Sequence, residues 1–188
     1  MKNIVLFASG GGSNAQQIMQ YFSNSSQIKV VAVFTNNATA GVLDKALQFD
    51  VPAIIFTREQ LADGTVLERL KEFNASLIVL AGFLWKFPQD IIAAYPNKVI
   101  NIHPALLPKY GGKGMYGIHV HRAVLENKEQ QSGITIHYVN DNYDEGNIIF
   151  QQAVALEECT TAEHIAQKVL ELEHSHFSRI IEEVLQTR

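Results

Sequence analysis

Short apolar runs alternate with segments of helical periodicity through the first hundred residues. The runs at residues 3–8, 29–34, 53–56, 77–80 and 99–102 are strand candidates. Between them, apolar residues recur at helical spacing, namely Ala15, Ile18, Met19 and Phe22; Leu43, Ala46 and Leu47; and Leu67, Leu70 and Phe73; a further short helix is expected from Pro88 toward Tyr95. This alternation predicts parallel βαβ units with right-handed crossovers, and such open sheets bind ligands beyond the carboxyl ends of their strands.

The pattern changes after residue 130. Residues 134–139 and 148–156 are two further strand candidates, joined by the polar loop Asn140–Asn147, and a helix of roughly 25 residues closes the chain. Thr160 and Glu163 have the spacing of a capping box at the start of that helix. We therefore expect an α/β, Rossmann-like fold: an open, mostly parallel twisted sheet with helices on both faces and an antiparallel strand pair toward the carboxyl terminus. No repeat or interdomain linker is visible, so residues 1–188 are expected to form a single domain.

Composition disfavours several classes of protein. The 188 residues are 47% hydrophobic and 18% charged, as in a folded globular chain, and a net charge of −4 without a basic block gives no reason to expect a nucleic-acid partner. The single cysteine, Cys159, excludes an intrachain disulfide; it lies in a polar run without an activating neighbour, so an incidental thiol is favoured over a catalytic one. No signal-peptide layout or membrane-length apolar run is visible, and a cytoplasmic location is expected.

A glycine-rich turn, Ser9–Asn14 (SGGGSN), follows the first strand candidate and begins the first helix. Glycines allow a tight turn, and the free N–H groups at a helix start attract an anion. An ordinary strand-to-helix turn is one interpretation, and a dinucleotide fingerprint is another, because Gly10, Gly12 and Ala15 fit G-x-G-x-x-A. The second strand candidate ends without the acidic residue that would bind a ribose, so a single phosphate is the preferred ligand.

Asn101 and His103 lie two residues apart at the end of the fifth strand candidate, and Pro104 and Pro108 stiffen the backbone that follows. Residues two apart in a strand point to the same side. Histidine exchanges protons near neutral pH, and an asparagine amide can donate a hydrogen bond to a developing oxyanion. A structural histidine is the alternative, but the polar pair at a strand end favours a catalytic site.

Acidic residues in two places are candidates for the same site. Asp141, Asp144 and Glu145 are either solvated, or one of them lies beside His103, where a carboxylate would favour the charged ring and raise its pKa. On the closing helix, Glu173 falls in the middle of the apolar face formed by Ile165, Ala166, Val169, Leu172, Phe177, Ile180 and Val184. A buried carboxylate without a partner is unfavourable. Glu173 is therefore expected to line a cavity and meet a substrate amine, to form an internal salt bridge, or to lie where the helix leaves the core.

Together, these motifs resemble those of the folate-dependent formyltransferases, most closely the branch that formylates glycinamide ribonucleotide in purine synthesis. The similar segments span nearly the whole chain: residues 9–14 (SGGGSN), 80–83 (LAGF), 101–110 (NIHPALLPKY), 133–139 (GITIHYV) and Asp144-x-Gly146. The resemblance implies the formyltransferase fold, 10-formyltetrahydrofolate as formyl donor and the glycinamide amine as acceptor. It implies small-molecule substrates, with neither a nucleic acid nor a membrane as partner, and leaves room for a homodimer. His119 and His121 lack the further ligands of a metal site, so no metal is expected.

The resemblance also assigns site residues by motif match. Asn101, His103 and Asp144 take the catalytic positions, with Asn101 and a protonated His103 stabilising the oxyanion while Asp144 keeps the ring charged. Glu173 matches the acid at the glycinamide end of the substrate. Gly12, Ser13 and Asn14 match the phosphate-binding segment, and the folate-binding positions are Arg58, Leu84, Trp85, Lys86, Phe87, Asn101, Asn140, Asp141, Asn142 and Tyr143.

Two features depart from the family pattern. Trp85 stands where several relatives carry arginine, and the run Tyr110–Gly117 is longer than in compact members. Within the family, transfer to initiator methionyl-tRNA and hydrolysis of formyltetrahydrofolate are the alternatives, and both enzymes carry an additional domain that this chain is expected to lack. A nicotinamide-dependent oxidoreductase is disfavoured by the missing ribose acid, and a non-catalytic nucleotide-binding module by the Asn101 and His103 pair.

Overall fold

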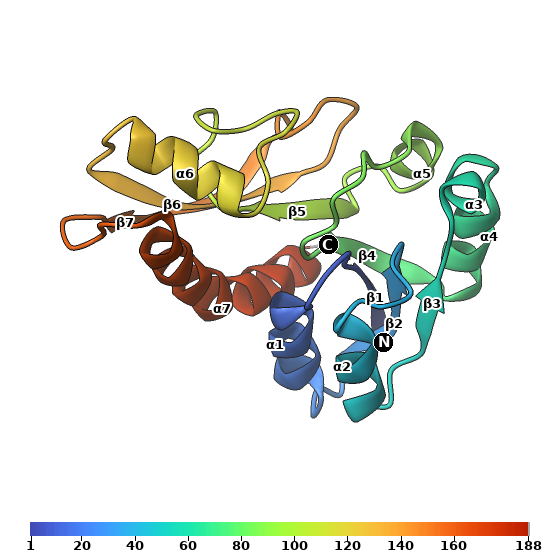
Figure 1. The fold of residues 1–188 in the computed structure, drawn as a ribbon. Helices are drawn as coiled ribbons and strands as arrows, with labels where there is room; N and C mark the ends of the chain where they lie inside the picture. The colour runs from blue at the N-terminus through green and yellow to red at the C-terminus, as the bar shows by residue number, and fades with distance from the viewer. Residues whose placement is uncertain (188) are drawn as a thin grey trace.

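Figure 1 shows the computed structural model of the protein, which describes residues 1–187. One sheet has the strand order β3-β2-β1-β4-β5-β6-β7. Its strands are β1 (Lys2–Phe7), β2 (Ile28–Thr35), β3 (Ala53–Ile55), β4 (Ala75–Leu80), β5 (Val99–His103), β6 (Gln131–Tyr138) and β7 (Ile148–Ala155). The helices are α1 (Ser13–Phe22), α2 (Val42–Gln48), α3 (Arg58–Ala62), α4 (Thr65–Glu72), α5 (Gln89–Ala94), α6 (Ile118–Glu126) and α7 (Ala162–Gln186). Among residues 1–187, no helix combines the length and the apolar character needed to span a bilayer.

Strand direction divides the sheet into two parts. Strands β3, β2, β1, β4 and β5 are parallel to one another, whereas β6 runs antiparallel to both β5 and β7. The expected fold class is therefore confirmed, including the antiparallel strands at the carboxyl-terminal side. Strand order reverses between β1 and β4, so the chains leaving these two strands turn to opposite faces and open a crevice at their carboxyl ends.

Alternating residues of the strands divide the core between the two faces of the sheet. On β1, Ile4 and Leu6 pack with the buried residues of α1, α2 and α7, whereas Val5 and Phe7 pack with those of α3, α4 and α5. Burying each such side chain contributes about 1.5–3 kcal/mol relative to leaving it exposed. Helices therefore cover both faces of the sheet, as Figure 1 shows, and α6 contacts α7.

The expected start of α7 is wrong by one residue. Thr161, rather than Thr160, caps the helix: its side chain accepts a hydrogen bond from the His164 N–H, so Thr160 and Glu163 do not form a capping box. Glu163 still lies in the first turn, where its negative charge interacts favourably with the helix dipole and stabilises the helix. A capping box does occur at the start of α3, a helix of five residues that is too short to show periodicity.

Candidate active site

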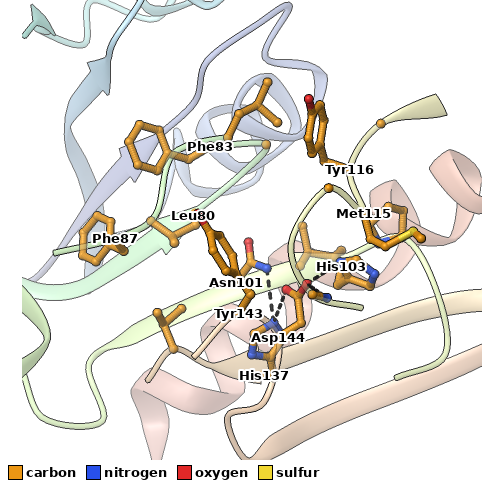
Figure 2. A pocket seen from close by; sticks show the side chains of 18 of the residues that line it. Leu80, Phe83, Phe87, Asn101, His103, Met115, Tyr116, His137, Tyr143 and Asp144 are labelled. Carbon is orange, nitrogen blue, oxygen red and sulfur yellow. Dashed lines mark hydrogen bonds and ion pairs between the residues drawn. The ribbon is translucent and has the colours of Figure 1, made fainter. Parts of the chain in front are cut away.

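A cavity of about 730 Å³ opens beyond the carboxyl ends of β4 and β5. Its wall is formed by the segment that follows β4, the end of β5, residues 112–118, the loop before β7 and one face of α7. Figure 2 shows the side chains of this wall gathered around the end of β5. The cavity lies at the edge of the sheet where open α/β folds bind their ligands.

Asn101 and His103 both line this cavity, as the alternation of side chains along a strand predicted (Figure 2). The ring of His103 is buried, and its Nε2 lies 2.7 Å from the carbonyl oxygen of Tyr110. Because a carbonyl oxygen can only accept, Nε2 carries a hydrogen. The other ring nitrogen, Nδ1, faces the loop that precedes β7.

Asp144 of that loop brings a carboxylate to the same wall. Its Oδ2 lies 3.6 Å from His103 Nδ1 and accepts a hydrogen bond of 2.9 Å from the Gly112 N–H. The residue has a φ of 56°, in the left-handed region, which aspartate adopts more readily than most residues other than glycine. The amide of Asn101, the ring of His103 and the carboxylate of Asp144 therefore lie at one wall of one cavity.

The expected effect of a carboxylate on the His103 pKa is present, but the expected charged ring is wrong because burial has the larger effect. Burial lowers the pKa of His103 and outweighs the neighbouring Asp144 and the Tyr110 carbonyl, which both act to raise it. Burial also acts to raise the pKa of Asp144, but the neighbouring His103 and the hydrogen bond from the Gly112 N–H leave that pKa below its ordinary value. The pair is therefore an ionised carboxylate beside a ring that is mostly neutral at pH 7.

His137 belongs to the same cluster and is absent from the predicted set of site residues. Its Nδ1 lies 2.9 Å from the Tyr138 carbonyl oxygen, and its Nε2 lies 3.2 Å from Asn101 Nδ2 and 3.6 Å from Asp144 Oδ1. With the ring hydrogen on Nδ1, Nε2 accepts one amide hydrogen of Asn101 and holds that amide in place. His137 lies within the 133–139 motif, but only the register of β5 against β6 sets it opposite Asn101.

The predicted phosphate-binding segment forms the turn between β1 and α1. Gly12 has a φ of 70°, and a Cβ there would lie 2.5 Å from Val42 Cγ2, so the turn requires glycine at this position. Among the described residues, no side chain caps the start of α1, which leaves its N–H groups available to an anion. Of the three predicted residues, Asn14 lines the cavity, whereas Gly12 and Ser13 lie outside its lining.

Glu173 of α7 is only 8% exposed and lines the cavity, which is one of the three outcomes expected from its place on the apolar face. Its Oε2 accepts a hydrogen bond of 2.6 Å from Asn14 Nδ2, so its partner is an amide rather than a cation. Burial raises the pKa of Glu173 to about 7, although the bond from Asn14 acts in the opposite direction. Within residues 1–187, the buried Oδ1 of Asn14 has no hydrogen-bond partner. The two side chains therefore form a polar patch that can still bind a ligand.

Most of the predicted folate-binding residues surround the same cavity. Besides Asn101, its lining includes Leu84, Trp85, Lys86, Phe87, Asn140, Asn142 and Tyr143. Two predicted residues lie outside the lining: Asp141 accepts a hydrogen bond from Gln89, and the Arg58 guanidinium lies 4.5 Å from the centroid of the Trp85 ring. Arg58 therefore lies over the ring of Trp85, which lines the cavity, and is not itself part of the lining.

An amide, two imidazoles and a carboxylate gathered around one cavity at the strand ends of an open α/β sheet are the groups of an enzyme that uses acid–base catalysis. Residues 2–181 match the family model described as "Formyl transferase", and the chain belongs to this family. The resemblance inferred from the sequence motifs is therefore confirmed.

Relatives in sequence and in structure carry matching descriptions. Phosphoribosylglycinamide formyltransferase of Bacillus subtilis (strain 168) is 31% identical over 191 residues, a match that covers 98% of this chain and 95% of the relative. The chloroplastic phosphoribosylglycinamide formyltransferase of Arabidopsis thaliana is 37% identical over 194 residues; all of this chain matches, and it spans 66% of that relative's length. The crystal structure of glycinamide ribonucleotide transformylase 1 from Symbiobacterium toebii has a TM-score of 0.90 at 30% identity, with 100% of this chain and 89% of that chain covered.

Proposed function

We propose that this protein transfers the formyl group of 10-formyltetrahydrofolate to the amine of 5'-phosphoribosylglycinamide, a step of de novo purine biosynthesis. The observation that carries the proposal is the meeting of Asn101, His103 and Asp144 at one wall of a cavity that Asn14 and Glu173 also line. The likeness to relatives described as phosphoribosylglycinamide formyltransferases supports the choice of substrates. A cytoplasmic location stays a prediction, since one of these relatives is described as chloroplastic.

The part of the cavity lined by residues 84–87 and by Asn142 fits a folate as donor. Its volume of about 730 Å³ lies in the usual range of small-molecule sites. Leu84 and Phe87 provide apolar surface for a flat ring system, and the polar loop with Asn142 provides hydrogen-bonding groups for its edges. Arg58, stacked on Trp85, supplies a positive charge for the acidic tail of the folate.

The part of the cavity that Asn14 and Glu173 line fits the phosphorylated acceptor. Its phosphate would bind at the uncapped start of α1, beside Gly12 and Ser13. Glu173 would receive the glycinamide end, as the resemblance implies. Because Glu173 is bonded to Asn14 of the phosphate segment, the hydroxyl groups of the ribose are a second candidate for its carboxyl group.

Each group at the end of β5 has a defined part in the reaction. The acceptor nitrogen forms the new bond to the formyl carbon, and the carbonyl oxygen becomes an oxyanion to which Asn101 donates its second amide hydrogen. His103 starts neutral with its hydrogen on Nε2, so Nδ1 takes the proton that the amine loses, and Asp144 stabilises the charge that the ring gains. His103 then passes the proton to the folate nitrogen as the bond from that nitrogen to the formyl carbon breaks, which releases tetrahydrofolate.

The test is an assay of the purified protein with 10-formyltetrahydrofolate and glycinamide ribonucleotide, in which the product is identified by mass. We expect the N-formyl ribonucleotide from the wild type and, at the same rate, from His164→Asn, which replaces an exposed histidine in the first turn of α7. Formate as the only product would indicate hydrolysis of the donor instead. If intact 10-formyltetrahydrofolate gives no formylated product, the assignment of these substrates is wrong.

A further inference from the structure

The segment that follows β5 touches both partners of the His103 and Asp144 pair. The Tyr110 carbonyl oxygen meets His103 Nε2 at 2.7 Å, and two residues further the Gly112 N–H donates to Asp144 Oδ2 at 2.9 Å. Between them, a Cβ on Gly111 would lie 3.2 Å from Asp144 Cβ, closer than ordinary contact. Residues 110–112 therefore form a bracket that sets the position of the ring relative to the carboxylate.

Tyr110 in the bracket and Asp144 beside it both have a backbone conformation that is unfavourable for most residues with a side chain. Tyr110 has a φ of 57°, and Asp144, which the bracket contacts, has a φ of 56°. Residues with a Cβ persist in this left-handed region only where the surrounding structure holds them there. Contacts from outside the pair must therefore hold Tyr110 in place.

Glu129 makes such a contact from outside the cavity. Its Oε1 accepts a hydrogen bond of 2.9 Å from the Tyr110 hydroxyl and also lies 2.9 Å from Lys109 Nζ. Lys109 and Tyr110 hold the pKa of Glu129 below its ordinary value, so the carboxyl group is ionised at pH 7. Hydrogen bonds to an ionised acceptor are stronger than those between neutral groups.

Tyr110 and Glu129 both lie in the long connection between β5 and β6, and their contact holds two distant parts of it together. This connection begins after His103, the last residue of β5, and includes Tyr110 and then α6. It ends at Gln131, the first residue of β6, so Glu129 lies two residues before β6. Its bond to Tyr110 therefore links the first part of this connection to the residues that directly precede β6. Neither Tyr110 nor Glu129 belongs to the lining of the cavity.

We propose that Glu129 and the Tyr110 hydroxyl are positioning residues of the active site. Their hydrogen bond fixes the bracket, and through it the orientation of His103 and the hydrogen on its Nε2. The kinetic part of this inference rests on the proposed function, whereas the state of the His103 ring is a property of the free protein.

Four variants separate this role from a general effect of substitution. Glu129→Gln keeps an oxygen that accepts the Tyr110 O–H, whereas Glu129→Ala does not. Tyr110→Phe removes the hydroxyl and keeps the ring. Lys109→Met removes the other partner of Glu129, a side chain that is 68% exposed, and serves as the matched control.

Steady-state kinetics give the first readout. We expect Glu129→Ala and Tyr110→Phe each to lower kcat about tenfold, with KM for both substrates within about twofold, because substrates still bind while the reacting groups are misaligned. We expect Glu129→Gln and Lys109→Met to keep kcat within about threefold. The double variant of Tyr110→Phe with Glu129→Ala should be no slower than the slower single variant, since both remove one interaction.

Nuclear magnetic resonance of histidine-labelled protein gives a second readout that does not depend on turnover. Imidazole nitrogen shifts, assigned with His103→Asn, report which nitrogen carries the hydrogen. We expect the Nε2–H form in the wild type and in Glu129→Gln, and mixed tautomers in Glu129→Ala and Tyr110→Phe. Equal loss of kcat in both Glu129 variants, a change in KM alone, or an unchanged ring in all variants would overturn the inference. If the tautomer of His103 changes as expected but the protein formylates no ribonucleotide, the proposed function is wrong and the positioning role is upheld.

Discussion

Burial of a single side chain, Glu173, makes the stability of the protein depend on pH. Its pKa rises from 4.5 to about 7 because the folded protein takes the carboxyl group out of water. The folded state therefore holds this proton more tightly than the unfolded state does. The contribution to stability is fully present below about pH 4.5 and is lost as the pH rises toward 7. At about 1.4 kcal/mol per pKa unit, the loss is about 3 kcal/mol.

Glu173→Gln tests this linkage, because it removes the ionisation and keeps an oxygen that accepts the Asn14 bond. We expect the variant to be more stable than the wild type at pH 8 by up to about 3 kcal/mol, and to be nearly equal to it at pH 4.5. Urea unfolding at the two pH values measures the difference. The same pH dependence in both proteins would show that the pKa of Glu173 is not raised. We also expect a higher KM for the ribonucleotide, which would place Glu173 in its binding site.

Asn101→Ala and His103→Ala test the groups that act on the carbonyl. Loss of one oxyanion donor or of the proton acceptor should lower kcat by about 10²–10³, while KM changes much less. Steady-state kinetics with each substrate varied in turn measure both constants. Weaker binding at a normal kcat would instead make these residues part of the substrate-binding surface.

Individual site residues can be predicted when their chemistry and their motif agree. Asn101, His103 and Asp144 are predicted in this way, and the structure brings them to one wall of a cavity, while their catalytic roles stay predictions. The His103 pKa could not be predicted, because its desolvation depends on the packing of the whole wall. His137 could not be found for a related reason: its bond to Asn101 follows from the strand register, which no local pattern reveals.

At the scale of elements, periodicity locates all seven strands to within three residues of their observed bounds. Apolar runs mark strands well because each buried strand needs side chains on both faces. The five-residue α3 shows no period, and the adjacent Thr160 and Thr161 offer two caps between which the sequence pattern does not choose. Helix ends are therefore less predictable than helix faces.

The loop before β7 depends on one glycine, and its replacement tests how the loop places Asp144. A Cβ on Gly146 would lie 1.6 Å from the Tyr138 carbonyl oxygen, so Gly146→Ala must displace the loop backbone. We expect a loss of about 1–3 kcal/mol in stability and a fall in kcat larger than that loss would explain at a temperature where the variant is folded. Thermal unfolding and kinetics measure the two effects.

Gly64→Ala is the matched control for the loop variant. Gly64 has a φ of 89° and no atom within 4 Å of an added Cβ, so alanine there adds strain without a clash. It should lower stability by about 1 kcal/mol and leave kcat unchanged. If both glycine variants affected kcat equally, the loop would have no special part in placing Asp144.

At the scale of the whole molecule, the order of the strands in the sheet brings the residues of the site together. Asn14, Asn101, Asp144 and Glu173 are distant in sequence and line one cavity because the sheet reverses its strand order between β1 and β4, while one face of α7 forms part of the cavity wall. The alternation of elements predicts the fold class, but strand order and the shape of the cavity follow from long-range packing. Organisation of residues 1–188 as a single domain and a homodimeric assembly both stay predictions.

The central claim is that this wall catalyses formyl transfer to an amine, and a single-turnover experiment tests it most directly. The donor carries carbon-13 in its formyl group, and the wild type is compared with Asp144→Asn. We predict that the label moves to the ribonucleotide amine, and that Asp144→Asn slows the transfer by about 10²-fold or more because a neutral amide does not stabilise a charged His103. Label recovered as formate, or an equal rate in both proteins, would contradict the account.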